Sequence, residues 1–370
     1  MHVLVLLAQH HWTGAAEPVL QIANGLVARG HKVTFVYTRK PSGHLAGHVE
    51  ESALRTLPEV KLQRKGLHPL ATFADWRRLR AFILEQNVDV VFCHHSHDHW
   101  LALASRWGLS RRPVVVRQVH ESRHLQPGLD RRWLFGHSDA IIVAALSWQE
   151  KLVQNSGLPA ERIEVIAPAV DCERFSPEQN TQAIRQEIDA AQDDALVGLV
   201  SRIKTGRGHE LALAAMEIVR RTKPGARLLF VGRGEGKSAL SEVVHSKGAQ
   251  DWVHFLGYRT ADLPAIYAAL DVSLLLGEGS DGSCRAALEA IACGTPVAAL
   301  PVGTLPATLA DDQTGYFAAH DPEDLAAKIL ATLDRTDLGA KAREYALQHF
   351  SIQRRVDAAE NLFNHLTAGR

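Results

Sequence analysis

The chain has few cysteines, no net charge and no long apolar run. Its four cysteines, Cys93, Cys172, Cys284 and Cys293, are scattered and form no CxxC pair. This spacing predicts neither a disulfide framework nor a zinc site, and it fits a reducing cytoplasm. No segment approaches the roughly 18 apolar residues of a membrane-spanning helix.

The beginning of the chain lacks the features of a secretory signal. MHVLVLLAQHHWTG is apolar for only about six residues and has no basic region before them, so we interpret it as a buried first strand. The 41 Lys+Arg balance the 41 Asp+Glu, with a mildly basic first half and a mildly acidic second half. So weak an asymmetry predicts no nucleic-acid partner.

What is present is an ordinary globular composition, with 46% hydrophobic and 22% charged residues. At 370 residues the chain is long enough for two domains of roughly 150 residues each. In the first half, short apolar strands alternate with helical patterns, which predicts a parallel, doubly wound sheet. The strands are expected at 3–8, 32–37, 88–94, 113–120 and 140–145.

The pattern restarts after a polar connector at 176–195, which has little strand signal. We therefore expect a second Rossmann-like half and a ligand in the cleft between the halves, at the carboxyl ends of the strands. A last amphipathic segment, 340–366, is expected to be helical. The strands of the second half are expected at 195–203, 227–232, 253–257, 272–277 and 296–301.

The segment 281–297, DGSCRAALEAIACGTPV, carries two acids around a Gly-Ser turn that leads into a helical run. Glu289 follows Asp281 by about two helical turns, at roughly 3.6 residues per turn. Free N–H groups at a helix start suit an anion, so a phosphate and sugar hydroxyls could share one site. The alternative is a solvated helix with an acid at its start, which the helix dipole alone favours.

This segment resembles the E-x7-E motif of the retaining glycosyltransferases of family 4, EGFGLxxLEAxAxGxPV. Asp281 replaces the first glutamate and Cys284 the second glycine of the turn. The resemblance implies the GT-B fold, an α/β fold of two Rossmann-like doubly wound domains facing across a cleft, with a C-terminal helix crossing back to the first domain. The matching residues are Glu289, Ala290, Gly294, Pro296 and Val297.

The resemblance also implies domain boundaries and site residues. We expect an acceptor-side domain at 1–177, a nucleotide-sugar domain at 178–345, and a helix at 346–370 that packs on the first domain. Expected donor-binding residues include the turn residues and the cation that follows them: Gly282, Ser283, Cys284 and Arg285.

The segment VSRIKTGRGHELALAAM resembles the family's G-R-x4-K-G pattern, with Arg202 at the Arg position and Arg207 in place of Lys. Two cations beside a glycine-rich turn suit a diphosphate that gains charge as it leaves. The alternative is a pair of surface arginines in a basic loop.

The segment VGRGEGKS at 231–238 is neither a P-loop nor a dinucleotide fingerprint, since Val231 and Lys237 stand where those motifs need glycine. It resembles the family's VGxGP-type loop, and the resemblance implies that Gly232 is a donor-binding residue. HFLGY at 254–258 resembles the HFxG segment, whose following backbone holds the nucleotide base, so Tyr258 is expected there.

In the first half, Gly14 matches the family's GGxE-type loop, whereas Ala15 replaces its second glycine and narrows the allowed backbone angles. His120 in RQVHESRH is the candidate catalytic histidine beside the reacting sugar; a core or capping histidine is the alternative. His94, His95, His97 and His99 match no zinc pattern. The resemblance to GT-B enzymes likewise implies no bound metal and no cofactor beyond the donor substrate.

A basic run with Trp76 suggests a peripheral contact with an anionic membrane or acceptor, or simply a solvated helix face. Its cations are Lys61, Arg64, Lys65, Arg77, Arg78 and Arg80.

The expected activity is a cytoplasmic, metal-independent, hexosyl-type transfer with retention, from a nucleotide diphosphate sugar to a glycan or glycolipid hydroxyl. Asp281, Glu289 and His120 are its catalytic candidates. Family resemblance places the acceptor in a bacterial envelope glycan such as lipopolysaccharide. The alternatives are an inactive sugar-nucleotide-binding protein, or another GT-B enzyme such as an epimerase or a phosphorylase. A nicotinamide dehydrogenase lacks its glycine fingerprint.

Overall fold

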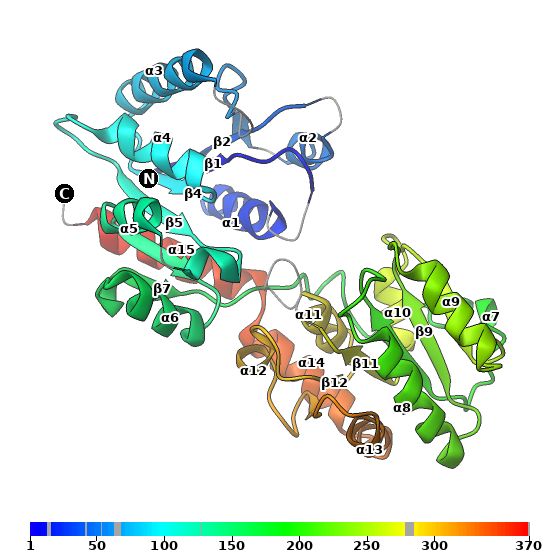
Figure 1. The fold of residues 1–370 in the computed structure, drawn as a ribbon. Coiled ribbons are helices and arrows are strands. Elements are labelled where there is room, and N and C mark those ends of the chain that lie inside the picture. The colour runs from blue at the N-terminus through cyan, green and yellow to red at the C-terminus, as the bar shows by residue number, and fades with distance from the viewer. Residues whose placement is uncertain are drawn as a thin grey trace. The chain divides into compact units, whose positions relative to one another are not determined.

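A computed structural model describes residues 1–12, 16–40, 43–52, 54–62, 68–126, 128–277 and 285–368. They form two compact units, each with its own parallel sheet (Figure 1). Unit 1 comprises Met1–Pro168 and Ile352–Arg370, and unit 2 comprises Ala169–Ser351. Within the described ranges, no helix is both long enough and apolar enough to span a membrane.

Unit 1 is built on seven parallel strands in the order β3-β2-β1-β4-β5-β6-β7. These are β1 (His2–Leu7), β2 (Lys32–Tyr37), β3 (Arg55–Thr56), β4 (Val90–Cys93), β5 (Val114–Gln118), β6 (Ala140–Val143) and β7 (Ile163–Val165). Its helices are α1 (Ala16–Ala28), α2 (Leu45–Glu50), α3 (Pro69–Glu85), α4 (Ser96–Arg106), α5 (Leu129–Gly136), α6 (Leu146–Ser156) and α15 (Ile352–Thr367), with 3-10 turns η1 (Ser122–Leu125) and η2 (Ala160–Arg162).

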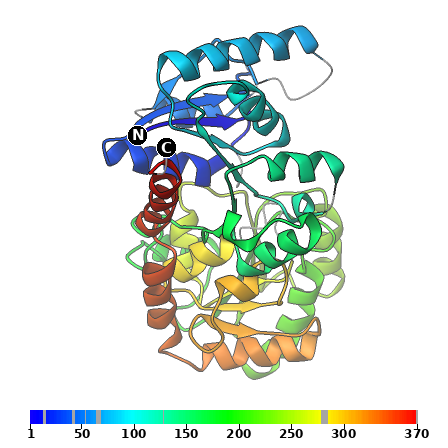
Figure 2. The same ribbon diagram turned by 90° about the vertical axis from the view of Figure 1, so that its left-hand side faces the viewer.

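Helices cover both faces of the unit 1 sheet, so every residue of β1 is buried (Figure 2). Side chains alternate along a strand, and Val3, Val5 and Leu7 pack with α1 and α15. Leu4 and Leu6 face the other way, into the core formed with α3 and α4. An uninterrupted apolar run is therefore what this strand needs.

Helix α15 is part of unit 1 although it is distant in sequence. Phe363 is fully buried in the α1 core, and Arg29 pairs with Glu360 at 2.5 Å. Gly25 provides room for this packing, since a Cβ there would lie 2.4 Å from a Val356 methyl. The C-terminal helix is thus fixed to α1 by close packing and by an ion pair.

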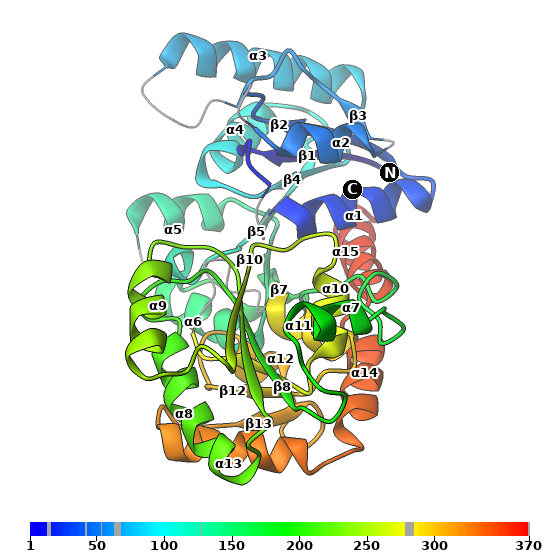
Figure 3. The same cartoon turned by 90° about the vertical axis from the view of Figure 1, so that its right-hand side faces the viewer.

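Unit 2 has six parallel strands in the order β10-β9-β8-β11-β12-β13. Helices α8, α9 and α13 lie on one side of these strands and α10, α11 and α14 on the other (Figure 3). The strands are β8 (Leu196–Val200), β9 (Arg227–Val231), β10 (Val253–Gly257), β11 (Val272–Leu275), β12 (Val297–Ala299) and β13 (Gly315–Phe317). The helices are α7 (Gln182–Glu187), α8 (His209–Thr222), α9 (Lys237–Ser246), α10 (Leu263–Ala269), α11 (Arg285–Ala292), α12 (Leu305–Thr308), α13 (Pro322–Leu333) and α14 (Leu338–His349).

The predicted fold class, two Rossmann-like parallel sheets, is confirmed. Three strands were not predicted, namely β3, β7 and β13, and each lies at the edge of its sheet. An edge strand of two or three residues needs no long apolar run, because one side of it faces solvent.

The expected single helical segment 340–366 is two helices that belong to different units. Phe350 and Ser351 separate them, and the Phe350 carbonyl accepts the Val170 N–H at 2.9 Å. The first stretch of unit 1 ends at Pro168, whereas 177 was the expected boundary. Arg343 on α14 donates to the carbonyls of Cys172 and Phe175, and these hydrogen bonds tie residues 172–175 to unit 2.

Candidate functional site

Unit 2 has a pocket of about 280 Å³ at the carboxyl ends of β8 and β11. The strand order reverses between these two strands, since β9 and β10 lie to one side of β8 and β11 to β13 to the other. Open parallel sheets bind ligands at such a reversal. The pocket is lined by Leu199, Val200, Ser201, Arg202, Arg207, Tyr267, Leu274, Leu275, Leu276, Gly277, Arg285, Ala286, Glu289 and Leu305.

Two glycines place Arg207 at this pocket. Gly206 and Gly208 both have a φ of 79°, in the left-handed region that glycine adopts without strain. A Cβ on Gly208 would lie 2.2 Å from the Leu276 Cβ, so the turn presses directly on the end of β11. Arg207 is half-buried and makes no hydrogen bond or ion pair with any residue in the described ranges. Its guanidinium is therefore available to an anionic ligand.

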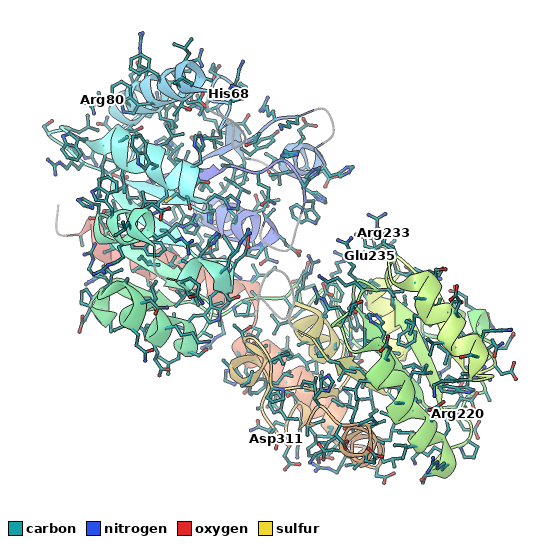
Figure 4. All side chains as sticks on the ribbon, in the orientation of Figure 1. His68, Arg80, Arg220, Arg233, Glu235 and Asp311 are labelled. Atoms are coloured by element: carbon teal, nitrogen blue, oxygen red, sulfur yellow. The ribbon has the colours of Figure 1, made fainter. Side chains whose placement is uncertain are left out.

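Arg202 follows β8 and lines the same pocket, but it has an internal partner. Its guanidinium donates to Glu235 at 2.9 Å, and both side chains are about two-thirds exposed. Figure 4 labels Glu235 beside Arg233, beyond the end of β9. A ligand phosphate can compete for Arg202, because an exposed ion pair contributes little stability.

Glu289 is the buried acid of the site, with only 4% of its surface exposed. One turn earlier on α11, Arg285 donates from Nε to Glu289 Oε1 at 2.6 Å. Tyr267 lines the same pocket close to Glu289, and burial, followed by the charge of Glu289, raises the pKa of this tyrosine well above the usual range. Burial and the same charge raise the pKa of Cys293 to about 12. Glu289 therefore presents a negative charge in a site of low polarity, with a cation beside it.

The predicted donor residues Gly232 and Tyr258 do not line this pocket. Gly232 has a φ of 147°, and a Cβ there would lie 2.0 Å from the Ser201 carbonyl oxygen. Only glycine lets the β9 loop pass the end of β8 this closely. Tyr258 is 63% exposed after β10, and the Arg233 guanidinium lies 4.7 Å from the centre of its ring.

His120 belongs to unit 1, where the strand order reverses between β1 and β4. It follows β5, is 8% exposed, and its Nε2 lies 3.0 Å from Nδ1 of His94. Burial, and then the charge of Arg117, lowers the pKa of His120 well below its usual 6.5. The ring is therefore neutral at pH 7.

Sequence reasoning missed the buried ion pair beneath these histidines. Asp98 accepts the backbone N–H groups of Ala8, His94 and His95, and so joins the ends of β1 and β4. Arg117 is 2% exposed and lies 3.8 Å from the same carboxylate. One signal was present, because an arginine inside the apolar strand VVVRQV must have a buried partner.

Several predicted residues lie outside the described ranges: Gly14, Ala15, Arg64, Lys65, Asp281, Gly282, Ser283 and Cys284. The histidines considered as metal ligands diverge, because His95 reaches Gln9 and His99 reaches Ser138. Among the residues that the structure describes, no group of three or more His, Cys, Asp or Glu side chains could hold a metal ion.

Two family models match the chain. One, described as Glycosyltransferase Family 4, matches residues 12–174, and the other, Glycosyl transferases group 1, matches residues 180–349. Among solved structures, a glycosyltransferase of Rickettsia africae superposes with a TM-score of 0.86 at 16% identity, over 100% of this chain and 99% of that one. Anabaena HepE, solved with UDP-glucose, superposes with a TM-score of 0.77 at 20% identity, over 98% of this chain and 99% of the HepE chain.

The similar proteins found by sequence are also named as glycosyltransferases. A D-inositol 3-phosphate glycosyltransferase of Mycobacteroides abscessus is 31% identical over 69% of this chain and 61% of its own length. A GDP-mannose-dependent alpha-(1-6)-phosphatidylinositol monomannoside mannosyltransferase of Mycolicibacterium smegmatis is 27% identical over 92% of this chain and 90% of its own length. The match thus spans less than two thirds of the first of these relatives.

Two doubly wound units, with polar groups gathered where each strand order reverses, define a GT-B protein. The two family models cover both units, and the chain belongs to glycosyltransferase family 4. The resemblance drawn from the segment at 281–297 is therefore confirmed at the level of the family.

Proposed function

We propose that this protein is a retaining glycosyltransferase that moves a sugar from a nucleotide diphosphate sugar to an acceptor hydroxyl. The observation that supports this most is the convergence of Arg202, Arg207 and Glu289 on one pocket. Glu289 is distant in sequence from the two arginines, and together the three residues supply the cations and the acid that a nucleoside diphosphate needs.

In this proposal the two arginines neutralise the departing diphosphate. Its charge grows as the bond between the sugar carbon and the phosphate oxygen breaks, and preorganised cations stabilise that charge most in the transition state. Glu289 accepts hydrogen bonds from the ribose hydroxyls. Asp281 and the N–H groups that follow it would hold the donor sugar, as the family resemblance implies. The acceptor attacks from the same face, and the leaving phosphate takes its proton.

The acceptor we propose is a hydroxyl of a bacterial envelope glycan or glycolipid, reached from the cytoplasmic side of the membrane. Unit 1 supports a peripheral membrane contact, because exposed aromatic and leucine side chains on α3, α4 and α5, or directly after α4, accompany the exposed cations Arg77 and Arg78. Those side chains are Leu70, Phe73, Leu84, Trp100, Trp107, Leu129 and Trp133.

The test is a panel of UDP-, GDP- and ADP-sugars in thermal shift, followed by a transfer assay with each donor that binds. We expect one nucleotide to raise the melting temperature and its sugar to appear on an acceptor with the anomeric configuration retained. Binding without turnover of any bound donor would favour an inactive sugar-nucleotide-binding protein. Inverted product would refute the retaining assignment. Flotation with anionic vesicles tests the membrane contact separately.

A further inference from the structure

The hydrogen bond between His94 and His120 determines which nitrogen of His120 carries the proton. His94 follows β4 and His120 follows β5, and these parallel strands pair at Cys93 and Arg117. Their carboxyl ends therefore bring the two rings together, 3.0 Å apart between His94 Nδ1 and His120 Nε2. A neutral imidazole carries one N–H, so one ring donates in this contact and the other accepts.

The surroundings keep both rings neutral. His94 is fully buried and His120 is 8% exposed. Burial and nearby positive charges lower the pKa of each histidine well below its usual value. The charged and titratable groups around the pair are Arg117 on β5, Arg355 on α15, Asp98 on α4, and the histidines His95 and His124.

The other nitrogen of His94 decides between the two arrangements. His94 Nε2 is buried and has no hydrogen-bond partner among the residues that the structure describes. If His120 were the donor, His94 would carry its proton on Nε2, as a buried N–H without an acceptor. Orphaned buried N–H groups are rarer than unsatisfied acceptors. The positive charges of Arg117 and Arg355 also favour a lone pair over an N–H at His94 Nε2.

The ring of Phe92 does not change this outcome. It packs against His94 in an edge arrangement, with 4.3 Å between the ring centres. An aromatic face accepts an N–H much more weakly than oxygen does, so this contact would not compensate a buried donor. His94 therefore donates from Nδ1, and His120 accepts at Nε2 and carries its own proton on Nδ1.

We propose that His94 is a positioning residue that holds His120 in the Nδ1–H tautomer, so that His120 meets the substrate as a neutral hydrogen-bond donor and not as a base. Nδ1 of His120 has no hydrogen-bond partner in the described ranges, so its N–H is available to a ligand oxygen. The fitting ligand atom is an oxygen of a sugar or a phosphate. This inference depends on the proposed function, because it assigns a role to His120 in that reaction.

The direct test is long-range ¹H–¹⁵N correlation on the full-length protein labelled with [¹⁵N]histidine. The difference from His120→Asn assigns the His120 signals. We expect a protonated Nδ1 and an unprotonated Nε2 at pH 7.5. A protonated Nε2 on His120 would overturn the proposal whatever the activity is.

Three substitutions at His94 test the functional consequence. His94→Asn keeps an N–H donor where Nδ1 stood, so kcat should fall less than about 5-fold. His94→Asp offers only an acceptor and would reverse the tautomer, and His94→Leu removes the contact. Both should lower kcat about 100-fold, the usual effect of losing one preorganised donor.

A matched control is His99→Asn, another buried histidine, which bonds Ser138 at 2.7 Å. It should lower stability without lowering kcat. If His94→Asp fails to fold, His94→Leu and the spectrum still decide the question. Full activity in His94→Leu and in His120→Asn would overturn this inference while leaving glycosyl transfer intact. Absence of transfer by the wild type with every donor would instead refute the proposed function.

Discussion

Replacing Glu289 by glutamine tests the nucleotide site most directly, because the change removes a charge and almost no volume. The wild-type carboxylate is 4% exposed, and Arg285 holds one of its oxygens at 2.6 Å. In the proposed complex the carboxylate accepts both ribose hydroxyls. Glutamine has one neutral acceptor oxygen and an NH₂ group that would face a hydroxyl or Arg285.

The expected loss follows from these contacts. A hydrogen bond to a charged group contributes about 1.5–3 kcal/mol and a neutral one about 0.5–1.5 kcal/mol. Over two ribose hydroxyls we expect a loss of about 2–3 kcal/mol in donor binding, or about 30- to 150-fold in Kd. Stability should change little, since Arg285 is 35% exposed and solvent weakens its pair with Glu289 to about 0.5–1 kcal/mol.

Isothermal titration with the preferred nucleoside diphosphate measures the first quantity, and the melting temperature measures the second. Glu217→Gln is the control, because it removes a half-buried acid of unit 2 that pairs with Lys247 and does not line the pocket. Unchanged affinity in Glu289→Gln, with an intact fold, would refute the assignment of this carboxylate to ribose. A large fall in melting temperature would mean instead that the acid is mainly structural.

Three further predictions concern unit 2. Arg207→Ala should weaken nucleoside diphosphate binding about 10- to 100-fold by titration, through loss of a charge-assisted contact, whereas the exposed Arg221→Ala should not. Gly232→Ala should destabilise the protein in urea unfolding more than Gly248→Ala, because only the first adds a clash, 2.0 Å from a carbonyl oxygen, to the strain of a positive φ. Burial, followed by Arg207, lowers the pKa of His209 to about 4, so its contribution to stability is complete above pH 6.5. About 3 kcal/mol should be lost as the pH falls towards 4, and His209→Gln should remove that dependence.

Much of the scaffold could be predicted because local pattern determines it. Strands β1, β2, β9 and β10 are apolar runs bounded by turns, and each appears within a residue or so of its expected range. The edge strand β13 could not be predicted this way. Gly315–Phe317 is a strand only because β12 lies beside it, and that pairing is not local information.

The site was predictable where a motif places residues on neighbouring turns, and less so where the sheet brings distant residues together. Arg202, Arg207 and Glu289 were found from spacing and resemblance, and one pocket contains all three. The contact between His94 and His120 depends on the register of β4 with β5, which no spacing rule reveals. The spacing of the histidines at 94–99 matched no zinc pattern but did not reveal the partners of His94 and His99, which are His120 and Ser138.

Topology explains why the polar residues of both units gather where they do. At the reversal of strand order, neighbouring crossovers leave on opposite faces of the sheet, so no helix covers the strand ends there. Arg117 and Asp98 occupy this edge of unit 1, yet both are almost completely buried, and burying a charge pair gains little stability over apolar packing. Their benefit is therefore geometric, since Asp98 fixes the backbone of His94 through its N–H group. His94 can fix the tautomer of His120 only if the backbone of His94 is itself held in place. The buried pair of Asp98 and Arg117 therefore supports the proposed N–H donor of His120.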